Sequence, residues 1–133
     1  MDCVRRWWHD ELEARDLTTT PEFWRTERDD YGGSRCHAWG AHPIAHFVNI
    51  LLGIRPAAPG MKKIVFRPEF CGLDWAKGTV QTPLGPVTSE WRRTPRGADV
   101  KLAIPCGMTA RIGLPGHRAT LRGPATRRYH MAL

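Results

Sequence analysis

Several features that would define common protein classes are missing from the sequence. No run of 18 or more apolar residues occurs, so we expect no transmembrane helix. The first residues carry four acidic side chains and no apolar segment, so we expect no signal peptide and a cytoplasmic location. The four cysteines form no C-x-x-C pair, which makes a zinc finger improbable and favours free thiols in a reducing compartment. At 133 residues, the chain is too short for a complete TIM-barrel enzyme.

Acidic residues are scarce in the second half of the chain. Residues 61–133 hold 13 Lys+Arg against 4 Asp+Glu, whereas residues 1–60 hold 7 against 9. A basic half raises the hypothesis of nucleic-acid binding, because Lys and Arg neutralise phosphates. This half lacks the clustered aromatics of an RNA-binding platform, however. We therefore expect no nucleic-acid and no membrane partner, and interpret the basic half as a solvated strand surface with a loose basic end.

Two stretches have helical periodicity. Residues 3–17 place apolar side chains near one face, and the helix should end before Pro21. A second helix is predicted over 42–52, with Pro43 at its first position and Gly53 just past its end. Its apolar stripe predicts a largely buried helix packed on the C-terminal half or on a surface outside this chain; the stripe comprises Ile44, Phe47, Val48 and Leu51.

After Gly60 the periodicity changes from helical to alternating. Short runs of alternating apolar and polar residues are separated by Pro and Gly, which is typical of an antiparallel β-sandwich. The expected strands are 62–67, 78–82, 86–92, 98–104 and 108–114, with a further short strand near 119–121.

Several patterns for enzyme chemistry are incomplete. His42 and His46 would share a helix face, but the Glu of an H-E-x-x-H zinc motif is missing, so we expect no metal site. Cys36 and His37 are adjacent, a spacing that rarely lets a nucleophile and its base face each other. Ser89 lacks a G-x-S-x-G setting.

Glu22 is the strongest catalytic candidate from residue chemistry alone. It lies in a long loop, 18–35, next to Phe23 and Trp24. Aromatic rings beside a carboxylate commonly line sugar sites, because apolar sugar faces pack on rings. The alternative is a surface glutamate next to a core tryptophan, and composition leaves both interpretations open.

A set of ordered motifs resembles the C-terminal end of bacterial α-L-rhamnosidases. The residues SRCHAWGAHP (34–43) and LLGIRP (51–56) are the most specific blocks. Further matching pieces follow in order: PGMKKI (59–64), RP (67–68), LDWAKGTV (73–80), TPLG (82–85), SEW (89–91) and IPCGMTA (104–110). The resemblance covers about residues 4–122, and the residues beyond Arg122 match little.

The resemblance implies an α+β architecture in two parts. Residues 1–55 would form the last helical hairpin of an (α/α)6 six-hairpin catalytic barrel. Residues 60–133 would form the C-terminal β-sandwich, antiparallel and jelly-roll-like. The chain then looks like a C-terminal fragment that needs the remainder of the barrel as a partner.

The family also implies a reaction: inverting hydrolysis of terminal α-L-rhamnosides, without a metal or other cofactor. Residues TTPEFW (19–24) are similar to the segment that carries the family's general base, which assigns that role to Glu22. His37 maps to a sugar-hydroxyl contact, and Trp39 and Trp24 to substrate-binding aromatics. The ligand would be a rhamnoside-containing glycan or glycoside.

The resemblance assigns no residue of this chain to the family's general acid. Nothing in the chain is similar to the acidic motif around it, and one carboxylate cannot serve as both acid and base. We therefore expect the chain to be inactive alone. The alternative hypothesis is a non-catalytic β-sandwich that binds carbohydrate or acts as an accessory interaction module.

Overall fold

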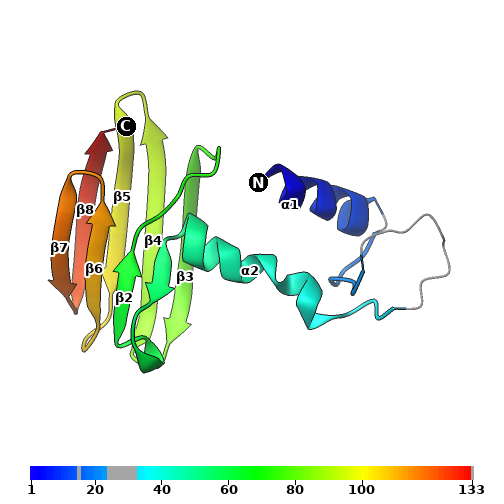
Figure 1. The fold of residues 1–133 in the computed structure, drawn as a ribbon, viewed down its shortest axis with the longest axis horizontal. Coiled ribbons are helices and arrows are strands. Elements are labelled where there is room, and N and C mark those ends of the chain that lie inside the picture. Colours follow the sequence, from blue (N-terminus) through cyan, green and yellow to red (C-terminus); the bar gives the residue numbers. More distant parts are fainter. Residues whose placement is uncertain (15, 24–32, 133) are drawn as a thin grey trace. The chain divides into compact units, whose positions relative to one another are not determined.

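The computed structural model describes residues 1–14, 16–23 and 33–132, and divides them into two compact units (Figure 1). The first unit is Met1–His46 and the second is Phe47–Leu133. The division lies before the seam expected at 55–60, because residues 47–59 pack with the strands that follow them. Each unit is described by itself below.

The first unit begins with a helix that widens along its length. α1 (Asp2–Trp7) is followed by η1 (Trp8–Glu13), whose turns are of the wider i→i+5 type, and the Ala14 N–H donates to the His9 carbonyl across 2.8 Å. Trp7 and Leu12, five residues apart, are buried. The predicted helix over 3–17 is therefore present but shorter.

Helical residues return before the end of this unit and continue into the next. They form η2 (Ala38–Ala41), α2 (Pro43–His46) and η3 (Phe47–Leu51), and Pro43 opens α2 as predicted. Within this chain the apolar stripe is buried only at its end, since Ile44 is 60% exposed while Leu51 is only 8% exposed.

Gly53 follows the last helical residue and has φ 68, as predicted for a residue that ends a helix. A Cβ at this position would collide with the backbone of Arg67 and Pro68. Glycine is therefore required here both by its left-handed conformation and by a close approach of two chain segments.

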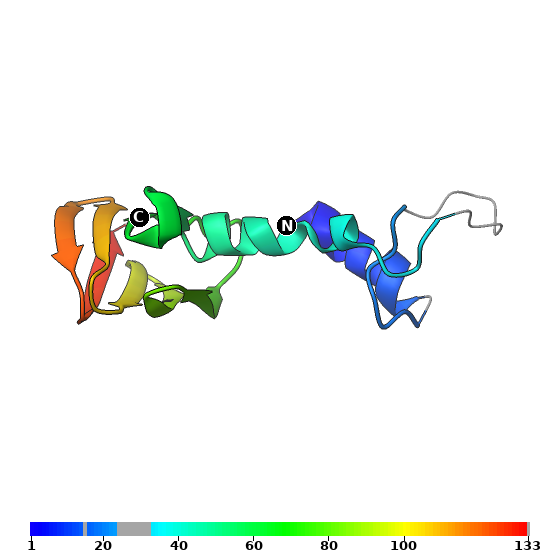
Figure 2. The same cartoon turned by 90° about the horizontal axis from the view of Figure 1, so that it is seen from below.

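The second unit is a β-sandwich of two four-stranded sheets, seen as two layers in Figure 2. One sheet has the order β1-β2-β6-β7 and the other β3-β4-β5-β8. The strands are β1 (Ile54–Pro56), β2 (Lys63–Phe66), β3 (Trp75–Thr82), β4 (Gly85–Thr94), β5 (Gly97–Ile104), β6 (Thr109–Leu114), β7 (His117–Arg122) and β8 (Ala125–Ala132). A short turn, η4 (Pro59–Met61), precedes β2.

Three strand predictions need correction. β2 and β6 run parallel, so the sandwich is not purely antiparallel. β1 was not expected, because three residues are too few for an alternating pattern. β8 lies in the region interpreted as a loose basic end, but it pairs with β5 over its whole length, from Ala125 opposite Ile104 to Ala132 opposite Gly97.

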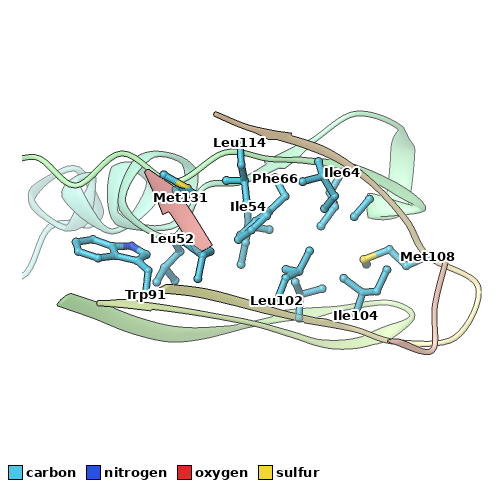
Figure 3. Packing of buried hydrophobic residues seen from close by; sticks show 14 residues of the cluster. Leu52, Ile54, Ile64, Phe66, Trp91, Leu102, Ile104, Met108, Leu114 and Met131 are labelled. Atoms are coloured by element: carbon cyan, nitrogen blue, oxygen red, sulfur yellow. The ribbon is translucent and has the colours of Figure 1, made fainter. Parts of the chain in front are cut away.

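Apolar side chains from both sheets meet between the layers (Figure 3). Ile54, Ile64 and Phe66 come from the first sheet, and Trp91 and Leu102 from the second. All five are at most 1% exposed. Complete burial of one such side chain contributes about 1.5–3 kcal/mol, so this core holds the sandwich together.

The end of the helical segment is fixed to the sandwich by specific contacts. The indole of Trp91 donates to the carbonyl of Leu51, and the Phe70 ring lies 4.6 Å from the Trp91 ring between centroids. Leu52 packs over Gly78, where a Cβ would come within 2.5 Å of Leu52 Cδ1. The residues after His46 thus belong structurally to the sandwich.

Candidate functional site

Two loop segments of the first unit pair through their backbones and position the predicted site. The Glu22 N–H donates to the Ser34 carbonyl across 2.9 Å, and the His37 N–H donates to the Thr20 carbonyl across 2.8 Å. The Thr20 hydroxyl donates back to the His37 carbonyl across 3.1 Å. These bonds hold residues 20–22 beside 34–37, although 12 to 17 positions separate the bonded partners.

The Glu22 carboxylate lies between a backbone donor and a histidine. Its Oε2 accepts a hydrogen bond from the Ser34 N–H across 3.0 Å. His37 Nδ1 lies 3.8 Å from the same oxygen, so the two side chains form an ion pair when the imidazole is protonated. Both side chains remain about one-third exposed, at 31% for Glu22 and 33% for His37. A ligand in solvent can therefore reach both groups.

Trp39 adds an exposed aromatic ring beside the histidine. Its ring meets the His37 ring edge to face, with centroids 6.3 Å apart and planes at 64°, and the residue is 82% exposed. An exposed ring fixed beside polar groups is suited to packing against an apolar ligand face. Trp24, the fourth predicted site residue, lies outside the described residues. Of the four, the structure thus brings Glu22, His37 and Trp39 together.

A hollow of about 280 Å³ adjoins the carboxylate within this unit. Glu22 is the one acidic residue among the described residues that line it; the others are Cys3, Val4, Trp7, Pro21, Trp39, Gly40 and Pro43. A mainly apolar wall with one carboxylate is the composition of many small-molecule sites.

Three residues that shape the site were not identified from the sequence. Thr20 and Ser34 form the bonds that fix Glu22 and His37, but short polar residues in a loop carry no periodic signal. At Gly40, a Cβ would lie 2.5 Å from the Pro21 carbonyl oxygen and 2.8 Å from Thr20 Cβ. In the sequence, only the position of Gly40 within the CHAWG block indicated that the backbone of residues 20–21 passes close to it.

The described part of the chain offers no metal site. His42 and His46 do lie together, with ring centroids 4.9 Å apart, but no group of three or more His, Cys, Asp or Glu side chains is assembled among the described residues. The four cysteines are free and exposed. No helix in the described residues is long and apolar enough to cross a membrane.

The fold defines the class of protein: a two-sheet β-sandwich domain preceded by a short helical unit that carries a carboxylate–histidine–tryptophan site. The sequence model of the bacterial alpha-L-rhamnosidase C-terminal domain matches residues 53–128, which is more than half of the chain. The chain therefore belongs to this family. An alpha-L-rhamnosidase of Alteromonas sp. (strain LOR) is 33% identical over 72 residues, which are 53% of this chain and 8% of that protein.

Solved structures of alpha-L-rhamnosidases share the fold. The Dictyoglumus thermophilum enzyme matches with a TM-score of 0.69 and 25% identity, over 78% of this chain and 12% of that one. The Aspergillus terreus enzyme matches with a TM-score of 0.77 and 23% sequence identity over 90% of this chain. The Streptomyces avermitilis enzyme, whose structure is complexed with L-rhamnose, matches with a TM-score of 0.66 and 24% sequence identity over 90% of this chain. The chain spans only 15% and 14% of those two chains.

Proposed function

We propose that the chain is the C-terminal part of an α-L-rhamnosidase-type hydrolase that removes terminal α-L-rhamnose with inversion. Residues 1–55 supply the end of an (α/α)6 barrel and residues 60–133 the C-terminal sandwich. The family membership of the sandwich supports this proposal. Two solved rhamnosidases also align over 90% of the chain, which is more than the sandwich alone occupies.

The observation that carries the catalytic assignment is the geometry of Glu22. Among the described residues, both polar contacts of its carboxylate are made by Oε2. Oε1 is thus the oxygen that takes a proton from the attacking water, while the Ser34 N–H fixes the orientation of the group. His37 and the exposed ring of Trp39 hold the sugar beside it, and Trp24 is proposed as a further aromatic contact.

The same chemistry implies that the chain alone does not turn over a rhamnoside. An inverting hydrolase needs a second carboxyl about 6.5–9.5 Å from the base, so that water fits between the base and the sugar. No stretch of the 133 residues resembles the motif around the family's general acid. That group comes from the remainder of the barrel, which is the partner of the helical unit.

One observation favours a second function. The family match covers residues 53–128 and does not include Glu22, His37 or Trp39. A sandwich that binds carbohydrate or serves as an accessory interaction module, without taking part in hydrolysis, is consistent with a match confined to these residues.

The test is a glutamate substitution in a parent protein that joins the chain to a complete upstream barrel. Glu22→Gln should lower kcat for an aryl α-L-rhamnoside by at least about 10²-fold, the scale of general-base catalysis. The control is Glu13→Gln, because Glu13 lies in the same unit with a side chain that is 63% exposed. Equal rates for the two variants would exclude Glu22 as the base. Turnover by the isolated chain, abolished by Glu22→Gln, would contradict the need for a second carboxyl.

A further inference from the structure

The outward face of the sheet β1-β2-β6-β7 carries mostly positive charge; Glu69, beyond the end of β2, pairs with Arg67 and Arg55 at its edge. Residues on β2 and β6 alternate between core and solvent, and the strand register gives the residues of β7 that share their outward face; no residue of β7 is buried. Lys63, Thr109 and Arg122 form one row across the three strands, and Val65, Arg111 and Thr120 form the next. Gly113 and Arg118 follow, with Arg67 just beyond the end of β2.

Two open depressions lie on this face and share residues Val65 and Arg111. One has a volume of about 460 Å³ and includes Arg67, Arg111 and Arg118. The other has a volume of about 600 Å³ and includes Lys63, Arg111 and Arg122. No acidic side chain lines either depression among the described residues. We call this surface, defined by Lys63, Arg67, Arg111, Arg118 and Arg122, the cationic face.

The outward face of the other sheet, β3-β4-β5-β8, carries both positive and negative side chains. On its outward face, Glu90 lies opposite Lys101, and Lys101 opposite Arg128. In the adjacent row, His130 Nδ1 lies 2.8 Å from Asp99 Oδ1. Positive and negative groups are therefore interspersed there, whereas the cationic face concentrates five cations, of which Arg67 is paired with Glu69.

We infer that the cationic face binds an extended polysaccharide that carries carboxylate groups. This inference rests on the proposed function, which makes the chain part of a carbohydrate-active enzyme. Four of the five cations are arginines, whose planar guanidinium matches a carboxylate in two hydrogen bonds. Arg67 already pairs with a carboxylate within the chain, with Nε 3.2 Å from Glu69 Oε1, and its side chain is still 59% exposed.

The spacing of the cations favours a polymer over a small anion. Strands lie about 4.8 Å apart, so Lys63 on β2 and Arg122 on β7 are about 10 Å apart at Cα. Arg118 and Arg122 are roughly 13 Å apart along β7. Spread over these distances, the five groups can each meet a different carboxylate along a chain, which one small anion cannot supply. Val65, Thr109 and Thr120 lie between them and offer an apolar contact and two hydroxyls to sugar rings.

Nucleic acid fits this surface less well. Neither depression is lined by an aromatic side chain on which a base could stack. A shallow sheet face also presents no helix or ribbon for the major groove. Because phosphates are nevertheless attracted to any cationic surface, DNA belongs in the test as a competing ligand.

The experiment titrates the complete 133-residue chain with polygalacturonate at about 50 mM salt, where charge contacts are weakly screened. The chain should bind, and Arg111→Gln/Arg118→Gln should weaken binding about tenfold, as expected for the loss of two exposed charge pairs. The matched control, Lys101→Gln/Arg128→Gln, removes the same charge from the other sheet and should change binding less than twofold. Uncharged dextran should not bind. Circular dichroism confirms that each variant is folded.

Four results would overturn the inference: no binding of polygalacturonate, an equal loss in both double variants, equal binding of dextran, or tighter binding of a DNA duplex at the same salt. Failure here is separable from failure of the proposed function. Polygalacturonate binding with a Glu22→Gln parent of unchanged rate would indicate a binding module. A strongly impaired Glu22→Gln parent without polygalacturonate binding would leave the proposed hydrolase function standing and the cationic face unoccupied.

Discussion

The indole Nε1 of Trp91 donates a hydrogen bond to the backbone carbonyl of Leu51, with 2.6 Å between the two atoms. Trp91 is 1% exposed and Leu51 is 8% exposed. The last carbonyls of a helix have no partner within the helix, and a buried one must find a donor elsewhere. A tryptophan 40 positions further along the chain supplies it, and so joins the helical end to the core of the sandwich.

Trp91→Phe should destabilise the chain by about 2–4 kcal/mol, because it leaves a buried carbonyl unpaired and removes part of a buried ring system. Urea unfolding would measure the loss. The control is Trp75→Phe, since Trp75 is 56% exposed and its loss should cost less than about 0.5 kcal/mol. Equal midpoints for the two variants would contradict a structural role for the indole donor.

Gly53→Ala should be more damaging than the same change in an open turn. Both Gly53 and Gly116 have positive φ, at 68 and 72, so alanine is strained at both. Only at Gly53 does a Cβ meet backbone, whereas nothing lies within 4 Å at Gly116. Gly116→Ala should cost about 1–2 kcal/mol, and Gly53→Ala should exceed it by more than about 2 kcal/mol in urea unfolding. Similar costs would show that the two segments can separate without penalty.

Ser89→Ala should stabilise the chain. Ser89 is fully buried, and its hydroxyl has no hydrogen-bond partner within the described part of the chain. Removing an unpaired buried hydroxyl should raise the free energy of unfolding by about 1 kcal/mol. Thr88→Ala is the comparison, because the Thr88 hydroxyl lies 3.0 Å from that of Thr79 at the surface. A loss of stability in Ser89→Ala equal to that in Thr88→Ala would indicate that Ser89 is satisfied by water.

Tyr129 should make stability depend on alkaline pH. Burial raises the pKa of its phenol above 10.0, and the charge of nearby Arg127 opposes this only in part. Above pH 10 the unfolded chain therefore loses this proton before the folded chain does, so the free energy of unfolding falls as pH rises. Tyr129→Phe removes this contribution, and its stability should fall less steeply between pH 9.5 and 11, measured with a reductant present. Parallel curves would contradict the raised pKa.

His37→Ala in the complete parent should raise KM for the rhamnoside more than it lowers kcat, because His37 is proposed to hold the sugar rather than to move a proton. His9→Ala is the matched control. Like His37, His9 lies near a glutamate, with its Nδ1 3.4 Å from Glu13 Oε2, but the His9 side chain is 70% exposed. A loss confined to kcat would assign His37 to the chemical step.

The sequence predicted those features that depend on local pattern. Pro43 marks the start of α2 because proline fixes φ near the helical value, and Gly53 marks the end of the helical stretch because glycine adopts positive φ without strain. The alternating runs at 86–92 and 98–104 fall within β4 and β5, since each buries one face. Of the candidate site, Glu22 was chosen from its residue type and its aromatic neighbours, and His37 and Trp39 were chosen from the family resemblance of the CHAW block; their roles remain predictions.

The features that the sequence did not predict depend on distant partners. β8 has polar or charged residues at most positions, and only its pairing with β5 makes it a strand. The parallel pairing of β2 with β6 joins segments more than 40 residues apart, which no local pattern can encode. Thr20 and Ser34 were missed for the same reason: their role is to hold two loop segments together.

The position of β8 has a consequence for synthesis. β3, β4 and β5 follow one another through short turns and can pair soon after they leave the ribosome, but β8 emerges last and closes the side of β5 opposite β4. Until then, β5 presents unpaired backbone groups together with Val100 and Leu102, side chains that end in the core. A nascent chain is exposed to edge-to-edge aggregation during that interval.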